Sequence, residues 1–226
     1  MTGQQLRNSI LQEAIQGRLV PNVLEPGEKT GAELLQDILA KHQKENTERV
    51  KKGKRITLST IEEEPWELPE EWCWCLLPNV ATIEYGFPFD STKFNSSRQG
   101  TPLIRIRDVV PGYTKTYTTE SASKEHLVRK GDMLTGMDGN FNVNFWDSDD
   151  AYLNQRVCRI TANKQIIEQR YLYYYLPIAF KEIEEGVSFV TVKHLSDKHL
   201  KAIAIPLPPR SIQRKIVEVL DGVIPQ

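Results

Sequence analysis

Apolar residues recur at helical spacing near both ends of the chain. The first stripe is followed by Gly17 and Pro21, which stop a helix, and the last one follows Ser211, a residue type that caps helix N-termini. Thr30 and Glu33 match a capping box ahead of another stripe. The three stripes are Leu6, Ile10, Leu11, Ala14 and Ile15; Leu34, Leu35, Ile38 and Leu39; and Ile212, Ile216, Val219 and Leu220. The sequence therefore predicts a helical hairpin over the first forty residues and a helix at the C-terminal end.

The middle of the chain has a different residue composition and pattern. From about Trp66, short runs of aromatic and β-branched residues alternate with Gly, Pro and Asp turns, which is typical of strands. One helix interrupts them, with a bend at Pro177 and an end near Gly186. The charge-rich stretch KHQKENTERVKKGKR before this body fits a solvated helix end or a linker. We expect an α+β fold, with a mainly β body bracketed by helices.

The stretch GMDGNFNVNFW, residues 136–146, alternates apolar and polar positions. This period predicts a strand with one buried face. Its polar positions are Asn140, Asn142 and Asn144, although Asn is depleted in strands. One interpretation is a solvated face that leads into a turn. The other is DNA reading, because an Asn amide can donate to and accept from an adenine edge.

Charge is unevenly distributed along the 226 residues, whose formal net charge is −1. The segment TIEEEPWELPEEW holds six carboxylates and no base, whereas residues 156–215 hold eleven Lys or Arg against five acids. Such segregation permits a phosphate-binding face on one side of the protein. Random clustering of surface charge is the alternative.

No long apolar run occurs, and the N-terminus lacks a basic region followed by an apolar stretch. We therefore expect a soluble, cytoplasmic protein that is not exported through a signal peptide. Cys73, Cys75 and Cys158 form neither a disulfide framework nor a four-ligand zinc set, so small buried apolar roles are expected for them.

Catalytic motifs are absent from the sequence: it contains no nucleophile elbow, phosphate loop or dinucleotide fingerprint. The histidines, at positions 42, 126, 194 and 199, have no metal-ligand spacing. Asp108, Asp132 and Asp138 could hold a divalent ion for phosphodiester cleavage, or could be turn residues that bond their own backbone. Recognition is the more natural function, with a metal-dependent nuclease or a scaffold that does not bind DNA as alternatives.

Several segments in series resemble the specificity subunits of bacterial type I restriction-modification systems. The N-terminal phrases LRNSILQEAIQGRLVP and ELLQDILAKHQKE resemble the family's helical region, and PWELPEEWCWCLL resembles the entry to its target recognition domain. The body adds GFPFDSTKF, GTPLIRIRDV, KGDMLTGMDGNFNVNFW and LNQRVCRI. The phrases TVKHLSDKHLKAIAIPLPP and QRKIVEVLD resemble the exit strand and the start of a helical spacer.

The resemblance implies a non-catalytic subunit that reads double-stranded DNA and holds methyltransferase subunits, which a restriction subunit joins. N6-adenine methylation would be done by the methyltransferase, which binds S-adenosylmethionine, and this chain would bind no cofactor or metal. Consistently, the chain has no Asn/Asp-Pro-Pro-Tyr/Phe motif. The implied domains are a helical region and linker at 1–56, a target recognition domain at 57–207 and the start of the spacer at 208–226.

The chain departs from the family pattern in two respects. Members usually have two recognition domains, and this chain has room for one, so it is either a half-subunit that pairs through its terminal helices or a fragment. In addition, Arg210 and Ile212 follow the double proline, and Pro225 stops the last helix early. A helix of roughly fifteen residues spans ~22 Å, which is short for a ruler between DNA half-sites ~34 Å apart.

Candidate contacts divide into three groups. For reading bases we expect Asn140, Asn142, Asn144, Arg105 and Arg107, although the two arginines also fit the solvated face of a strand. For binding phosphates we expect Lys93, Arg98, Lys115, Arg156, Lys193 and His194. The apolar helical positions are expected either to dock partners or to pack within the chain, and they are Ile10, Leu11, Ile15, Leu35, Ile38, Ile216 and Leu220.

Overall fold

The computed structural model of the chain describes residues 2–50, 61, 64–186 and 194–224. The chain forms two compact units. The helical unit comprises Met1–Val80, Ala162–Tyr175 and Lys201–Gln226, and the β unit comprises Ala81–Thr161 and Leu176–Leu200. The fold is α+β, as expected. In the described ranges, none of the helices is both long and apolar enough to cross a membrane.

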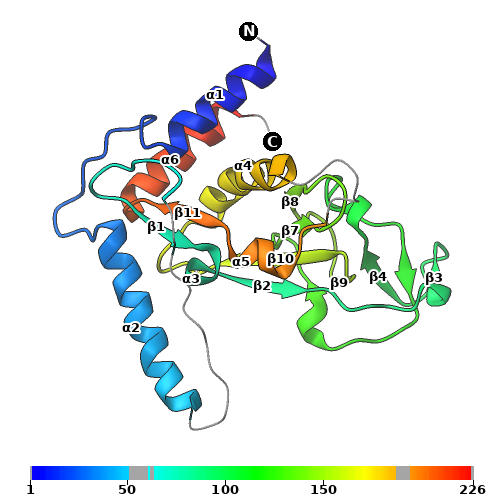
Figure 1. The fold of residues 1–226 in the computed structure, drawn as a ribbon. Helices are drawn as coiled ribbons and strands as arrows, with labels where there is room; N and C mark the ends of the chain where they lie inside the picture. The colour runs from blue at the N-terminus through cyan, green and yellow to red at the C-terminus, as the bar shows by residue number, and fades with distance from the viewer. Residues whose placement is uncertain (1, 51–60, 62–63, 187–193, 225–226) are drawn as a thin grey trace. The chain divides into compact units, whose positions relative to one another are not determined.

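The helical unit surrounds a two-stranded antiparallel sheet. Its elements are α1 (Gly3–Ile15), α2 (Gly31–Val50), β1 (Cys73–Leu76), α3 (Leu77–Val80), the first part of α4 (Gln169–Gly186), β11 (Ala204–Leu207) and α6 (Arg210–Val223). Strand β1 pairs with β11 in the register Cys73↔Leu207. Helix α1 lies beside α6, whereas α2 packs against β1 and α3 (Figure 1). The expectation that the first two helices form a hairpin with each other is therefore wrong.

The predicted capping box at the start of α2 is present. The Thr30 amide donates to Glu33 Oε2 at 2.8 Å, and the Glu33 amide donates to Thr30 Oγ1 at 3.2 Å. Between them, Gly31 packs so closely on β11 that a Cβ would lie 2.0 Å from the carbonyl oxygen of Leu207. Only glycine fits at this position, which seats the first turn of α2 on the sheet.

The start of α6 differs from the prediction, because Pro209 is the N-cap and Ser211 lies in the first turn. The carboxylate of Glu28, from the loop before α2, accepts the Ser211 amide at 2.6 Å and the Ser211 hydroxyl at 2.5 Å. A carboxylate at a helix N-terminus is favourable. Burial acts to raise the pKa of Glu28, but the hydrogen bonds from Ser211 and Glu25 and the charge of Arg214 together lower it. A capping group remote in sequence thus replaces the local one.

Two kinds of buried polar side chain tie the helical unit together. Gln213, fully buried on α6, donates to the carbonyls of Ile166 and Pro208 and accepts the Glu168 amide. On α4, Tyr171 donates to the carbonyl of Pro206 at 2.9 Å, and Tyr175 donates to that of Ala204 at 2.6 Å. Each hydroxyl is satisfied while its ring is buried, which explains the tyrosine-rich run in the sequence.

The β unit contains two sheets. The four-stranded sheet has the order β2-β10-β7-β8, and the five-stranded sheet has the order β3-β5-β4-β9-β6. The first comprises β2 (Ala81–Tyr85), β7 (Met133–Gly136), β8 (Val143–Phe145) and β10 (Val157–Ala162). The second comprises β3 (Phe94–Asn95), β4 (Thr101–Ile104), β5 (Tyr117–Thr118), β6 (Leu127–Val128) and β9 (Ala151–Leu153). The described residues also form the 3₁₀ turns η1 (Ser91–Lys93), η2 (Ile106–Asp108) and η3 (Lys124–His126) and helix α5 (Asp197–Lys201). Strand β7 pairs antiparallel with β8 and β10, β5 pairs antiparallel with β3 and β4, and β6 pairs antiparallel with β9, whereas β4 and β9 are parallel.

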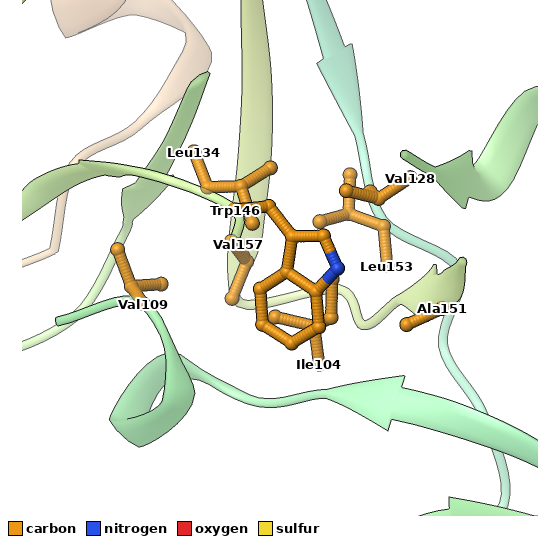
Figure 2. Close-up of a cluster of buried hydrophobic side chains, with 8 residues drawn as sticks. All are labelled: Ile104, Val109, Val128, Leu134, Trp146, Ala151, Leu153 and Val157. Carbon is orange, nitrogen blue, oxygen red and sulfur yellow. The ribbon is translucent and has the colours of Figure 1, made fainter. Parts of the chain in front are cut away.

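The core of the β unit is an aliphatic cluster around Trp146 (Figure 2). The indole is 1% exposed, and its Nε1 donates to the carbonyl of Asp149 at 2.8 Å. Its neighbours come from both sheets and from the loops that leave them: Ile104, Val109, Val128, Leu134, Ala151, Leu153 and Val157. Burial of these side chains therefore holds the two sheets together.

The continuous strand expected over residues 136–146 is wrong. Strand β7 ends at Gly136, the chain bends at Gly139 and Asn140, and β8 begins only at Val143. The alternation had another cause: Phe141 is buried between the strands and packs edge-on against Phe180, with ring centroids 6.2 Å apart. The asparagines thus lie on a strand-to-strand connection and its return, not along one strand face.

Arg159 on β10 joins the two sheets by hydrogen bonds. Its guanidinium donates twice to Glu84 of β2 at 2.8 Å and once to Asp132, ahead of β7, at 2.9 Å. It also donates to the carbonyls of Leu127 and Glu125, which belong to β6 and η3. The hydrogen bond with Glu84 raises the pKa of Arg159 further above its usual range. Its side chain is 14% exposed, so these bonds are shielded from water.

We expect Arg159→Met to destabilise the protein by ~2–4 kcal/mol, because the carboxylates of Glu84 and Asp132 would face each other without a cation. Urea unfolding measures the change. The matched control is Lys130→Met, which breaks an ion pair with Asp147 whose two side chains are 73% and 76% exposed and which should cost no more than ~0.5 kcal/mol. Equal stability of the two variants would contradict the bridging role of Arg159.

Candidate nucleic-acid interface

A groove of about 650 Å³ lies on the β unit. Three segments line it: β3 with the residue after it, the turn η2 with its N-cap, and the loop that leads to β5. The lining residues are Phe94, Asn95, Ser96, Arg105, Arg107, Asp108, Pro111, Tyr113, Lys115 and Thr116. Three of them, Arg105, Arg107 and Lys115, were predicted from the sequence to contact DNA. The structure therefore brings two predicted base readers and one predicted phosphate contact into one groove.

The arginines lie on a turn, not on the strand that the alternation with isoleucine suggested. Strand β4 ends at Ile104, and η2 follows, with Arg105 as its N-cap. Asp108 is only 7% exposed and accepts the Arg105 amide at 2.9 Å and the Thr114 hydroxyl at 3.0 Å. A buried carboxylate thus fixes the backbone from which both guanidinium groups project.

Aromatic rings and a hydroxyl hold the cations in the groove. Arg105 lies 5.8 Å from the centroid of Phe94, and Lys115 lies 5.9 Å from that of Tyr113. Arg107 Nη2 donates to Thr116 Oγ1 at 3.2 Å. The sequence reasoning missed Phe94 and Tyr113, although each stands within two residues of a lysine, a pattern that combines a stacking surface with a cation.

Arg98 occupies the tip of the loop between β3 and β4. Its φ of 61° is left-handed, and among the described residues no other non-glycine residue has a positive φ. Asn95 shapes the loop by donating to the carbonyl of Gln99 and accepting its amide and the hydroxyl of Ser97. Lys93, in η1, is also exposed beside this loop. Both predicted phosphate contacts therefore border the segment that lines the groove.

The three asparagines have different surroundings. Asn140 and Asn142 are exposed, and Asn142 Nδ2 donates to the carbonyl of Asn140 at 3.2 Å. Asn144 is half-buried: its Nδ2 donates to the carbonyl of Val110 at 2.7 Å, and its Oδ1 accepts the Phe145 amide at 2.9 Å. Asn144 thus holds the loop beside the groove with the same two atoms that an adenine edge would require.

Asp138 lies at the start of the β7–β8 connection that carries Asn140 and Asn142, which we call the asparagine turn. His194 Nδ1 lies 2.6 Å from Asp138 Oδ1, and Arg156 Nε lies 3.3 Å from Asp138 Oδ2. Two predicted phosphate contacts, Arg156 and His194, therefore gather on one carboxylate. The third basic residue of this group, Lys193, lies outside the described residues.

A close contact connects the groove to the asparagine turn. A Cβ on Gly136, at the end of β7, would lie 2.9 Å from Cγ1 of Ile106, in η2. The turn that carries Arg105 and Arg107 therefore packs directly on the strand from which the asparagine connection departs.

The aspartates of the nuclease alternative are separated by their contacts. Asp108 caps η2, Asp132 binds the Arg129 amide and Arg159, and Asp138 binds Arg156 and His194. Across the ranges that the structure describes, no three His, Cys, Asp or Glu side chains gather as a metal-binding group. The geometry therefore gives the nuclease alternative no support.

Five of the seven apolar helical positions are buried inside the helical unit. Leu11, Ile15, Ile38, Ile216 and Leu220 are between 0% and 8% exposed, whereas Ile10 and Leu35 are half-buried. The buried positions pack α1, α2 and α6 within their own unit. The packing interpretation thus has direct support for these five.

A β unit that carries a cationic, aromatic groove is typical of a nucleic-acid-binding domain. A family model described as the type I restriction modification DNA specificity domain matches residues 69–225. The chain belongs to this family.

The chain is similar to two specificity subunits from Escherichia coli. It is 41% identical over 157 residues to that of the type I restriction enzyme EcoBI, across 70% of this chain and 33% of that protein. It is 29% identical to that of EcoAI, across 97% of this chain and 39% of that protein. The chain therefore spans between a third and two fifths of the length of these relatives.

Two solved structures share the fold. The HsdS subunit from Thermoanaerobacter tengcongensis matches with a TM-score of 0.56 and 20% identity, over 98% of this chain and 49% of that one. A chain from a structure of a type I R-M system matches with a TM-score of 0.57 and 20% identity, over 97% of this chain and 50% of that one. One copy of the present fold thus corresponds to half of each.

The stability of variants at position 98 should depend on its left-handed backbone conformation. We expect Arg98→Gly to be more stable than Arg98→Ala by ~0.5–1 kcal/mol, because alanine keeps the strain of a positive φ and glycine relieves it. Thermal or urea unfolding of the two variants gives the difference. At the neighbouring Ser97, where φ is not positive, the order should reverse. A more stable alanine variant at position 98 would contradict the loop geometry.

Proposed function

We propose that this chain chooses the DNA sequence on which a type I restriction-modification complex acts. The β unit reads one half of a split target in double-stranded DNA. Methyltransferase subunits, which bind S-adenosylmethionine, methylate adenine, and a restriction subunit cleaves. The chain itself is non-catalytic in this proposal. The supporting observation is the convergence of Arg105, Arg107 and Lys115 in one groove beside the asparagine turn.

The contacts divide by their chemistry. Arg105 and Arg107 present planar guanidinium groups that match the O6 and N7 acceptors of guanine, and Asn140 and Asn142 are the candidates for adenine. Asn144 positions the neighbouring loop, because its amide is bonded to Val110. Lys93, Arg98, Lys115, Arg156 and His194 border these groups and would fix the register on the phosphates, as would Lys193.

The helical unit is the part that would hold the methyltransferase subunits. Its core is closed by its own side chains, among them Gln213 and the α4 tyrosines, so it can act as a rigid mount. Two copies paired through their terminal helices would supply two half-sites, and a longer protein with a second recognition domain would do the same.

Mapping of methylated adenines tests the proposal. The full chain, a methyltransferase subunit of its own system and S-adenosylmethionine are incubated with unmodified genomic DNA, and every modified adenine is located by sequencing. We expect one bipartite motif. A palindromic motif would indicate two copies of this chain, and an asymmetric one would indicate a second, different recognition domain. If methylation does not rise above that of the methyltransferase alone, and duplex titration shows no binding, the proposal is wrong.

A competition assay that compares affinity for the mapped site with affinity for unrelated duplex should distinguish base-reading from phosphate-binding residues. Asn140→Ala and Asn142→Ala should each weaken binding to the mapped site by ~1–3 kcal/mol and leave binding to unrelated duplex almost unchanged. Lys115→Met should weaken both and reduce the slope of log K against log salt by about 1.

Asn8→Ala is the matched control, because Asn8 is an exposed asparagine on α1 in the helical unit, and it should change neither affinity. Equal losses on the mapped site and on unrelated DNA for the variants at positions 140 and 142 would show that these asparagines do not read bases.

A further inference from the structure

Exposed apolar side chains lie on the loop that follows η2, part of which lines the groove. Val110 is 58% exposed and Tyr113 is 47% exposed, and Pro111 between them is exposed as well. We call Val110, Pro111 and Tyr113 the apolar tip. Large side chains of this kind cost free energy when they face water together, so a cluster at the edge of a binding groove marks a contact with a partner.

Hydrogen bonds from β8 and the chain beyond it make the apolar tip rigid. The carbonyl of Val110 accepts Asn144 Nδ2 at 2.7 Å, and the carbonyl of Gly112 accepts the Asp147 amide at 3.1 Å. The Gly112 amide donates to the carbonyl of Asp108 at 3.1 Å, with φ at +72°. Because these bonds fix the backbone at Val110 and Gly112, the apolar tip presents its side chains on a fixed frame.

The charges around the apolar tip select the partner. Pro111 and Tyr113 line the same groove as Arg105, Arg107 and Lys115, and the Lys115 ammonium lies 5.9 Å from the Tyr113 ring. An apolar surface bordered by three cations suits a polyanion with apolar faces between its charges. Duplex DNA fits this description, since stacked bases lie between two phosphate backbones.

We propose that the apolar tip is a wedge, which inserts between two base pairs from the DNA groove in which Arg105 and Arg107 read guanine, and kinks the duplex at the half-site. This inference rests on the proposed function and deepens it. Apolar side chains that separate a base step act in this way when neighbouring cations bind the flanking phosphates and keep the DNA bent. Asn144 is then a positioning residue, which holds the wedge through Val110 instead of reading a base.

A wedge adds a source of sequence preference that needs no hydrogen bond to a base. Pyrimidine–purine steps unstack and kink more easily than others, so the protein would favour such a step under the tip. The preferred half-site would therefore contain a flexible step at a fixed distance from the bases read by Arg105 and Arg107.

The test uses the full chain and the duplexes that it selects from a random pool. 2-Aminopurine is placed at successive positions of the selected site to detect unstacking, and energy transfer between dyes at the two ends measures bending. We expect increased fluorescence at one step and a shortened end-to-end distance. The double variant Val110→Ser/Tyr113→Ser should abolish both signals and weaken binding by about tenfold.

Three further variants sharpen the test. Tyr113→Phe keeps the apolar ring and should keep both signals, whereas Asn144→Ala leaves the tip in place but removes its anchor and should reduce both. Val219→Ser removes a valine that is 36% exposed on α6, and it should change neither signal.

The outcomes separate the wedge from the proposed function. Selective binding with a straight, fully stacked duplex overturns the wedge and leaves DNA reading intact. Distortion that persists in the double variant also overturns it, because another segment would then bend the DNA. Selection of no duplex at all overturns the proposed function, and the wedge with it.

Discussion

A single guanidinium group, that of Arg159, joins the two sheets of the β unit. Its hydrogen bonds reach Glu84 in the four-stranded sheet and Asp132 just before β7, and the carbonyls of Leu127 in the five-stranded sheet and of Glu125 in η3. The Trp146 cluster supplies the burial between the sheets, but apolar packing is non-directional. The bonds of Arg159 add direction, because a planar donor has a fixed set of acceptor positions.

The proposed DNA surface depends on this frame. Most of its groups lie on the β3–β4 loop, on η2 with the loop after it, and on the β7–β8 connection, which all leave the framed sheets. Binding residues on loops are useful only when a rigid scaffold fixes them. Side-chain hydrogen bonds also fix the loops themselves. Buried Asp108 accepts the amide of Arg105 in η2, Asn95 accepts the amide of Gln99 in the loop that carries Arg98, and Asn144 donates to the carbonyl of Val110.

The helical unit is organised by a different principle. Its chain segments come from three distant parts of the sequence, and buried polar groups bind them to one another: Gln213 joins α6 to the chain before α4, and Glu28 caps α6 from the loop before α2. Such contacts specify a unique arrangement, because an unpaired buried donor or acceptor is costly. They also explain why apolar positions such as Ile216 and Leu220 are buried here rather than exposed for docking.

The sequence by itself determined the α+β class, the N-terminal and C-terminal helices and the capping box at Thr30, because periodicity and caps are local properties of the chain. It also indicated three cations of the groove, Arg105, Arg107 and Lys115, but not its aromatic residues. Tertiary structure decided the rest. Strand β4 ends before Arg105, and the alternating stretch 136–146 forms a connection around buried Phe141 instead of one strand. Glu28, not Ser211, provides the capping group of α6, and the Asn144 amide is hydrogen-bonded to the carbonyl of Val110. The physical reason is that each outcome depends on a partner remote in sequence, which hydrogen-bonds a buried polar atom or fills a space in the core. The local spacing of residues cannot identify that partner.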